Sequence, residues 1–358
     1  MSKSVIIIGG GIIGASIAWH LARAGAAVTV LDAGEPGGIA TAASWAWINA
    51  SWGNPEPYAR LRMRAMAEWR TLDREVPGLA VNWCGGLIWD LAPEALADFA
   101  RQHRAWGYEL QRLDARAILA REPNLKKVPD FGYLAPGEAM VEPVKAALTL
   151  LAGARDLGAS VLSGARAKWL IEEDGRVTGI HTEEGPLRAD ETIVAAGAAT
   201  PELLASIGIS LKIETPAGLL AHSKPARELL RGLVMTPGLH VRQTAEGRLV
   251  AGTDFGGSDP TDRPEEMAAD LMAKVRDLIS GAEDLELDFH TVGFRPTPAD
   301  GFPALGRPGG RPGLYVAVTH SGVTLAPAIG LFARDEIVDG RRDPLLQPYS
   351  PDRAALAG

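Results

Sequence analysis

Cysteine is nearly absent from this chain: its 358 residues include one, Cys84. A single thiol excludes an intramolecular disulfide and a zinc site built from cysteines. His222, His290 and His320 show no metal-ligand spacing, so no metal site is expected. Free cysteines are usually buried, so Cys84 is expected to be a small buried apolar residue rather than a nucleophile. A reducing compartment, the cytoplasm, is the default location.

Long apolar runs and an excess of positive charge are absent as well. No run of about 18 apolar residues occurs, so no membrane-spanning helix is expected. The apolar run at residues 5–8 ends at a glycine cluster and has no signal-peptide cleavage pattern. Basic residues number 36 against 44 acidic ones, which gives a net charge of −8. This balance, with no local Lys/Arg cluster, argues against a nucleic-acid-binding surface.

The most informative stretch present is the N-terminal SVIIIGGGIIGASIAWHLARAGAAVTVLDAG. It begins with a β-branched run of the kind found in parallel strands buried on both faces. Gly9, Gly11 and Gly14 then fit G-x-G-x-x-G, apolar residues follow at helical spacing, and a second strand ends in Asp32. A glycine motif between strand and helix, with an acidic residue about 20 positions on, indicates a dinucleotide site.

Each residue of this motif has a physical role. Gly9 permits the tight turn, Gly11 lets the backbone approach a pyrophosphate, and Gly14 lets the helix pack closely on the strand. The helix N-terminus offers free N–H groups and its positive dipole end to the phosphates. Asp32 would accept hydrogen bonds from ribose hydroxyls and disfavour a 2′-phosphate. The alternative is a glycine-rich turn that binds nothing, and these residues alone leave NAD and FAD both open.

The rest of the chain alternates between two patterns. Strands are expected in GGLIWDLA, TIVAAG and LYVAVTH, and the tail from Arg341 is expected to be irregular. Between residues 211 and 289 the pattern is that of an antiparallel sheet with a helix, so a second architecture is predicted to be inserted into the α/β unit. The helices are expected over residues 60–75, 93–106, 143–157, 264–278 and 325–337.

Six segments, in this order, resemble the D-amino-acid oxidase superfamily of flavoproteins, which includes glycine oxidase and sarcosine oxidase. They are SVIIIGGGIIG with Asp32, MVEPVKAALTLLAGARDLGASV, ADETIVAAGAAT, GRLVAGTDFGG, VGFRPTPADGFPALG and GLYVAVTHSGVTLAPAIG. The resemblance covers nearly the whole chain and implies FAD rather than NAD. It implies an α/β fold made of two interleaved domains. The FAD-binding domain is Rossmann-type and glutathione-reductase-like, and it comprises residues 1–50, 140–210 and 291–358. The substrate domain is α+β, is built on a mixed or antiparallel sheet, and comprises residues 51–139 and 211–290.

The resemblance also implies which residues bind the cofactor. TIVAAG resembles the stretch that lies against the dinucleotide from the side opposite the glycine motif, and Ala167 matches the position whose backbone meets the adenine. THSGVTLAP opens the last helix, whose N–H groups would stabilise negative charge at N1 and O2 of reduced flavin; the alternative is a merely structural turn. The cofactor-binding residues expected are Gly9, Gly11, Ile12, Ile13, Gly14, Asp32, Ala33, Thr41, Ala43, Ser44, Ala167, Ala196, Gly197, Arg295, Ser321, Gly322, Val323 and Thr324.

A single cation, Arg295, lies in the stiff and largely apolar segment VGFRPTPADGFPALG. In the family that this segment resembles, the matching arginine binds the substrate carboxylate above the flavin. A planar guanidinium suits this task because it forms two parallel charge-assisted hydrogen bonds. The neighbouring prolines restrict φ, so less order is lost on binding. The alternative is an ion pair between Arg295 and Asp300 in a rigid turn.

The activity that the resemblance implies is oxidation of the C–N bond of a small amino or imino acid, such as glycine, sarcosine, a proline-like acid or a D-amino acid. The lone pair of the neutral amine assists loss of hydride from the α-carbon to flavin N5, and water hydrolyses the resulting imine to an oxo acid. The protein would contribute mainly by orienting the α-carbon over N5, because the flavin supplies the chemistry.

Several positions depart from the family pattern. His240 stands where several relatives have tyrosine, and it is either a substrate contact and base or a partly buried strand histidine. GRLVAG contains Arg248 but no lysine of the kind that promotes the oxygen reaction in sarcosine-oxidase-like members, so a dehydrogenase that passes electrons to a quinone or protein is credible. LYVAVTHSG has no cysteine to tether the flavin, so non-covalent FAD is expected. Trp45, Trp47 and Trp52 either wall the active site or form ordinary packing.

Two other functions remain open. A flavin module that trims a carboxymethyl group from modified tRNA would need a basic RNA surface, against which the net charge of −8 argues. A flavoprotein subunit that relays electrons to a protein partner would be nearly inactive alone. The sequence leaves open the exact substrate, its stereochemistry, the electron acceptor and whether the chain forms a homo-oligomer.

Overall fold

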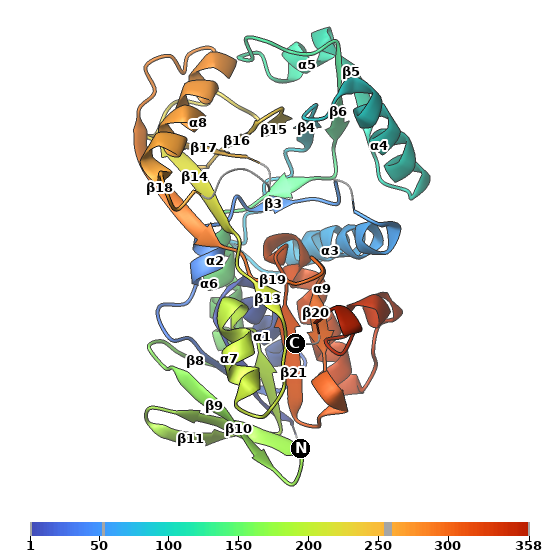
Figure 1. Cartoon of the computed structure of the whole chain (residues 1–358), viewed down its shortest axis with the longest axis vertical. Coiled ribbons are helices and arrows are strands. Elements are labelled where there is room, and N and C mark those ends of the chain that lie inside the picture. Colours follow the sequence, from blue (N-terminus) through green and yellow to red (C-terminus); the bar gives the residue numbers. More distant parts are fainter. Residues whose placement is uncertain (1, 52–53, 254–259, 357–358) are drawn as a thin grey trace.

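The computed structural model describes residues 2–51, 54–253 and 260–356. Two large sheets lie toward opposite ends of the molecule, with α3 (Glu56–Glu75) and α9 (Gly322–Arg334) between them (Figure 1). The first sheet has the strand order β20-β21-β12-β1-β2-β8, and all neighbours pair in parallel except β20 with β21. Its strands are β1 (Ser4–Ile8), β2 (Ala27–Leu31), β8 (Ser160–Leu162), β12 (Glu191–Val194), β20 (Ala304–Gly306) and β21 (Leu314–Val318).

Both faces of the first sheet are covered, which explains the continuous β-branched run in β1. Val5 and Ile7 of β1 belong to the core under the helices, whereas Ile6 and Ile8 belong to a separate core on the other face. A small antiparallel sheet covers that other face, and its strand β10 packs against β12. The covering elements are α1 (Ile12–Arg23) between α6 (Pro143–Asp156) and α9 on one face, and β9 (Ala167–Glu173), β10 (Arg176–Thr182) and β11 (Gly185–Arg188) on the other.

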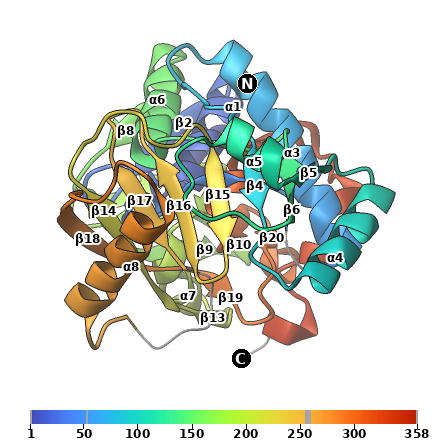
Figure 2. The ribbon, with the colours of Figure 1, turned by 90° about the horizontal axis from the view of Figure 1, so that it is seen from above.

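The second sheet is mixed and has the strand order β18-β14-β17-β16-β15-β4-β6-β5. β15 and β4 pair in parallel and the other neighbours are antiparallel. Its strands are β4 (Gly86–Ile88), β5 (Gln111–Asp114), β6 (Phe131–Ala135), β14 (Ala217–Ser223), β15 (Leu233–Thr236), β16 (Leu239–Gln243), β17 (Leu249–Gly252) and β18 (Leu287–Phe294). Figure 2 shows α8 (Pro264–Leu278) at one end of this sheet and α4 (Pro93–Ala105) and α5 (Ala115–Arg121) at the other. The predicted fold class, an α/β unit combined with a mixed sheet, is confirmed.

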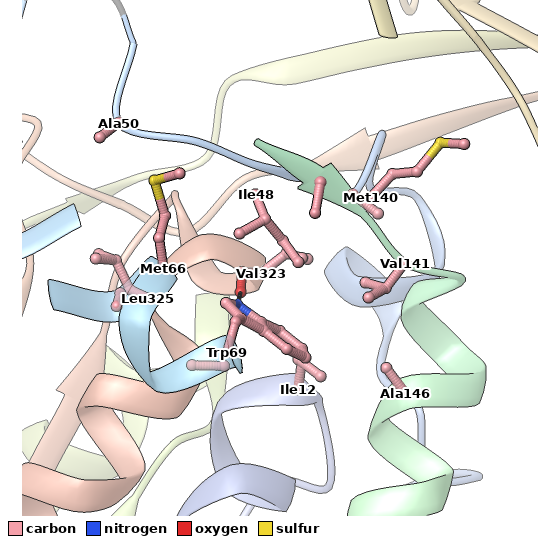
Figure 3. Close-up of a cluster of buried hydrophobic side chains, with 14 of the residues drawn as sticks. Ile12, Ile48, Ala50, Met66, Trp69, Met140, Val141, Ala146, Val323 and Leu325 are labelled. Carbon is pink, nitrogen blue, oxygen red and sulfur yellow. Dashed lines mark hydrogen bonds between the residues drawn. The ribbon is translucent and has the colours of Figure 1, made fainter. Parts of the chain in front are cut away.

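A fully buried tryptophan joins α3 to α9. Trp69 is 0% exposed, and its Nε1 donates hydrogen bonds to the carbonyl oxygens of Val323 at 2.9 Å and Thr324 at 3.1 Å. In Figure 3 its indole lies below Val323 in a cluster that includes Ile12 and Ile48. The large apolar ring contributes burial while its N–H remains satisfied, so the start of α9 is held in place by α3.

Element boundaries differ from the prediction at three places. α3 begins at Glu56 rather than at residue 60, because Pro57 and the acidic Glu56 favour a helix start. α9 begins at Gly322 rather than at residue 325, because glycine, valine and threonine have low helix propensity and hide the start. The tail, predicted to be irregular, forms short 3₁₀ helices at Pro344–Tyr349 and Ala354–Leu356. The remaining short elements are α2 (Ile39–Ala42), β3 (Trp47–Ile48), β7 (Ala139–Met140), α7 (Thr200–Ala205), β13 (Ile213–Glu214) and β19 (Thr297–Pro298).

Candidate active site

A cavity of about 730 Å³ opens at the carboxyl ends of β1, β2 and β12, where α1 and α9 begin. Dinucleotides bind at this edge of parallel sheets. Five of the predicted cofactor-binding residues are not among those that line it: Gly14, Ala43, Arg295, Ser321 and Thr324. The predicted residues that line the cavity are Gly9, Gly11, Ile12, Ile13, Asp32, Ala33, Thr41, Ser44, Ala167, Ala196, Gly197, Gly322 and Val323.

The glycine motif has the backbone geometry that its spacing predicts. Gly9 has a φ of +108°, a conformation that favours glycine, and a Cβ at this residue would overlap the carbonyl oxygen of Ala195. A Cβ on Gly14 would overlap the carbonyl oxygen of Gly9, so α1 can approach the end of β1 only because residue 14 is glycine. Gly11 immediately precedes α1 and lines the cavity. The first-turn N–H groups, which have no partner within the helix, therefore begin at the cavity wall.

Asp32 and Thr41 support this turn from two other segments. The Asp32 carboxylate accepts hydrogen bonds from the N–H groups of Gly10 at 2.7 Å and Gly34 at 2.9 Å. A carboxylate offers about four acceptor sites, so capacity remains for ribose hydroxyls. Thr41 Oγ1 accepts a hydrogen bond from the Ile12 N–H at 3.1 Å. A glycine cradle that a Cβ would fill, an acid at the end of β2 and a helix N-terminus together fit a dinucleotide.

The start of α9 forms another wall of the same cavity. This is the wall that the flavin end of FAD is expected to contact. Gly322 and Val323 line it, and Ser321 is the residue before the helix. Thr324 is 2% exposed, and its hydroxyl donates to the Trp47 carbonyl oxygen at 2.9 Å. Thr324 thus anchors α9 to β3, and its contact with a cofactor stays a prediction. Ala43 packs against β18, where a Cβ on Gly293 would overlap it.

Arg295 follows β18 directly and lies between Phe294 and Pro296, two residues that line the cavity. Its guanidinium lies against Gly218 of β14, because a Cβ at that glycine would overlap it. Partial burial lowers the pKa of Arg295, although a guanidinium remains charged at neutral pH. Its charge interacts electrostatically with His320 in the cavity wall and helps to lower the pKa of that residue.

The alternative of an ion pair between Arg295 and Asp300 is wrong. Both carboxylate oxygens of Asp300 accept hydrogen bonds from Arg353, at 2.6 and 2.7 Å. Arg353 also donates to the carbonyl oxygens of Pro303 and Ser350 at 2.8 and 2.9 Å. A residue of the C-terminal tail therefore holds the loop that follows Arg295.

His240 is not among the residues that line the cavity. It lies on β16 and is 8% exposed, and its Nε2 lies 3.5 Å from an oxygen of Asp90. Its ring centroid lies 5.8 Å from that of Trp45 and 6.5 Å from that of Trp47. These surroundings favour the packed strand histidine, and a catalytic role for His240 stays a prediction. Trp52 lies outside the described residues.

Sequence reasoning missed several residues of the lining, including Ile39, Phe294 and His320. Burial, aided by the charges of Arg62 and Arg295, lowers the pKa of His320 to about 4, so this imidazole is neutral at pH 7. Ile39 is 84% exposed, the highest value among the large apolar side chains of the described residues, and it lines the cavity. His320 had a signal, because it immediately precedes the Ser-Gly start of α9, whereas Ile39 and Phe294 had none.

A buried carboxyl group lies against β4 of the second sheet and predicts a dependence of stability on pH. Glu138 is fully buried and accepts hydrogen bonds from Trp47 Nε1 at 2.8 Å and from the hydroxyl groups of Ser51 and Tyr108. Burial raises its pKa from 4.5 to about 7. Between these two values the folded chain keeps a proton that the unfolded chain has lost, so stability falls as pH rises through this window.

The free energy of unfolding of the wild type is therefore expected to fall by about 3 kcal/mol between pH 4.5 and 7, relative to Glu138→Gln. Urea denaturation at a series of pH values measures the two slopes. Glu94→Gln, which changes an exposed carboxylate on α4, is the matched control and should keep the wild-type slope. Parallel slopes for the wild type and Glu138→Gln would contradict the assignment.

Three further observations bear on earlier expectations. In residues 2–51, 54–253 and 260–356, no helix is long and apolar enough to cross a membrane. Within the same residues, no group of three or more His, Cys, Asp or Glu side chains is placed to hold a metal ion. Cys84 is partly buried, and burial raises its pKa to about 11. Its thiol is therefore protonated at neutral pH and is a poor nucleophile.

Comparisons with known proteins agree with this geometry. Residues 4–335 match the family model described as FAD dependent oxidoreductase. The glycine oxidase of Pseudomonas putida is 29% identical over 381 residues, which cover 98% of this chain and 99% of that protein. The structure of iminodiacetate oxidase from Chelativorans sp. BNC1 is 26% identical with a TM-score of 0.84, over 97% of this chain and 99% of that one. L-Proline dehydrogenase from P. horikoshii, at 22% identity, shares the fold with a TM-score of 0.88 over 98% of this chain and 97% of its own. The chain therefore belongs to the DAO family of FAD-dependent oxidoreductases.

Proposed function

We propose that this enzyme oxidises the C–N bond of a small amino or imino acid that carries a free carboxylate. Arg295 carries the proposal: it is a permanent, partly buried cation held against Gly218 at the edge of the cofactor cavity. The names of two relatives, glycine oxidase and iminodiacetate oxidase, support a small amine with a carboxylate. Glycine, sarcosine, proline-like acids and D-amino acids all belong to this class.

In this proposal Arg295 binds the carboxylate through two parallel hydrogen bonds and so orients the α-carbon. The orientation of the guanidinium is fixed before the substrate binds, because β18 is paired with β14 and the guanidinium packs against Gly218 of β14. When bound, FAD supplies the hydride acceptor, and hydrolysis of the imine product yields an oxo acid with ammonia or a primary amine. The N-terminus of α9 stabilises negative charge that develops beside it.

We propose that the FAD is non-covalent and is held by the glycine turn, Asp32 and Thr41. Residues 1–50, 140–210 and 291–358 are proposed as the FAD-binding domain, and residues 51–139 and 211–290 as the substrate domain. β18 runs on to Phe294, four residues past the proposed boundary at residue 290. A cytoplasmic location remains the proposal, because the single cysteine fits a reducing compartment.

As the alternative to oxygen, we propose a quinone or a protein as the electron acceptor. The stretch GRLVAG carries one cation, Arg248. Arg248 forms an ion pair with Asp288 and donates to the Ser223 carbonyl oxygen at 2.8 Å, so its charge is engaged at the second sheet. A dehydrogenase is therefore the second candidate, within the same amine-oxidising chemistry.

Anaerobic loss of the visible flavin absorption band tests the proposed substrate class. We expect bleaching by at least one member of a panel of glycine, sarcosine, proline and D-alanine, and none by methylamine or pyrrolidine, which lack the carboxylate. Readmitted oxygen or an added quinone then identifies the acceptor by the rate at which the band returns. If dithionite bleaches the flavin but no amino acid does, the proposed function is wrong and the partner-dependent flavoprotein takes its place.

A further inference from the structure

Arg62 is a buried cation on α3 that the proposed reaction leaves without a role. It is 7% exposed, and its three hydrogen bonds go to neutral oxygens. Nε and Nη2 donate to the carbonyl and side-chain oxygens of Asn49 at 3.0 and 2.7 Å, and Nη1 donates to Ser321 Oγ at 2.8 Å. Its Cζ also lies 5.4 Å from the centroid of the Tyr58 ring, and its charge helps to lower the pKa of Glu138. Burial of a charge is costly, and among the described residues none of these contacts is an ion pair. A charge retained under these conditions calls for a further explanation.

The hydrogen bond to Ser321 connects Arg62 to His320 through one hydroxyl group. Arginine can only donate, so Ser321 Oγ accepts from Arg62 and has its own proton to donate. His320 Nε2 lies 3.0 Å from that oxygen and accepts its proton in the tautomer that is protonated at Nδ1. The lowered pKa of His320, about 4, agrees with a neutral ring that accepts at this nitrogen. Arg62 thereby sets the orientation of a side chain that lines the cavity.

The same hydrogen bond places the charge at the start of α9. Ser321 is the residue before this helix, and Gly322 and Val323, which follow it, line the cavity. A helix N-terminus alone carries roughly half a positive charge, and the guanidinium adds a full one at a distance of one hydrogen bond. Trp69, two turns along α3, also binds the first turn of α9. Two side chains of α3 therefore hold this helix start, so the position of the charge is rigid.

We propose that Arg62 is a positioning residue that acts through Ser321: it gives the N-terminus of α9 a full positive charge and so raises the electron affinity of the flavin bound beside it. The inference rests on one part of the proposed function, the placement of flavin N1 and O2 at this helix. It does not depend on which amine is oxidised. Arg295 recognises the substrate in this arrangement, whereas Arg62 acts on the cofactor.

Sulfite binding to the FAD-loaded enzyme tests the proposal without any amino acid. The sulfite electron pair forms a bond to flavin N5, no group leaves, and the added negative charge settles at N1 and O2. We expect Arg62→Gln to weaken sulfite binding by about tenfold or more and to lower the flavin midpoint potential, whereas Arg62→Lys retains most of both. The matched control is Arg64→Gln on the same helix, where Arg64 pairs with Glu68 at 2.7 Å; it should behave as wild type.

Added guanidinium separates a role of the charge from a role in packing. In Arg62→Ala, low concentrations of guanidinium should restore sulfite affinity, whereas urea, which has the same shape without the charge, should not. This comparison also tests the role of the Arg62 charge if Arg62→Gln fails to bind FAD. Equal responses to guanidinium and urea, or sulfite affinities of Arg62→Gln and Arg64→Gln that coincide, would overturn the proposal. An enzyme that fails the amino-acid panel can still give either result, so the two failures are distinguishable.

Discussion

Arg295→Ala is expected to lower kcat/KM for the amino-acid substrate by about two to three orders of magnitude, because truncating one partner of a buried hydrogen-bonded charge pair costs about 2–5 kcal/mol. The guanidinium lies beside the cavity and is fixed by β14, so its loss removes both the charge and the orientation of the substrate. Arg295→Lys should recover part of the affinity but not the two-point geometry. Anaerobic flavin reduction measured against substrate concentration separates weaker binding from slower hydride transfer.

Arg248→Ala is the control for Arg295→Ala. It removes a second arginine from the same sheet, one that pairs with Asp288 away from the proposed carboxylate site. It should leave KM near the wild-type value, and acetate should compete with substrate in this variant but not in Arg295→Ala. Equal KM values in the two variants would show that Arg295 does not bind the carboxylate.

Gly14→Ala is expected to give protein that is purified with little FAD and is less stable by several kcal/mol. The added methyl group would overlap the carbonyl oxygen of Gly9. The methyl carbon is fixed to Cα and the oxygen is part of the backbone, so neither can rotate away. Overpacking commonly costs about 1–3 kcal/mol, and here α1 must also move away from the turn that is proposed to bind the pyrophosphate. The flavin-to-protein absorbance ratio and thermal unfolding with added FAD measure the two effects.

Gly137→Ala is the matched control for Gly14→Ala. A Cβ at Gly137 would meet the Met66 side chain at 3.6 Å, which is ordinary contact. This variant should keep its FAD and melt close to the wild type. A Gly14→Ala protein with one FAD per chain and an unchanged melting temperature would mean that the close approach of α1 to β1 is not required.

The glycine turn could be predicted from the sequence because its geometry is local. Gly9, Gly11 and Gly14 lie within six residues of one another, between the end of β1 and the first turn of α1. A Cβ at Gly9 or Gly14 would overlap a backbone carbonyl oxygen, whereas a Cβ at Gly11 would only crowd the Thr41 hydroxyl at 3.3 Å. The buried core of β1 was predictable for the same reason, since a β-branched run fits a strand covered on both faces. Helical spacing placed the start of α9 at residue 325 rather than at Gly322, because its first residues have weak helix propensity and are held by Trp69 from a distant helix.

Charge pairing could not be predicted in the same way. Asp300, close to Arg295 along the chain, was the natural partner from the sequence, yet Arg353 from the C-terminal tail binds it. Nothing in the sequence linked Arg62 to Ser321 or His240 to Asp90, which lies 3.5 Å from it. Long side chains reach whichever partner the packing of distant segments brings near.

The sequence by itself determined the α/β class, the dinucleotide turn and the single cation in a proline-stiffened segment, because strand and helix periodicity and glycine sterics act over a few residues. Only the tertiary structure decided which groups share the site. It brought Arg62 to the start of α9 and raised the pKa of Glu138 to about 7. Burial and electrostatic coupling depend on every segment packed around a group, and those segments come from all parts of the chain.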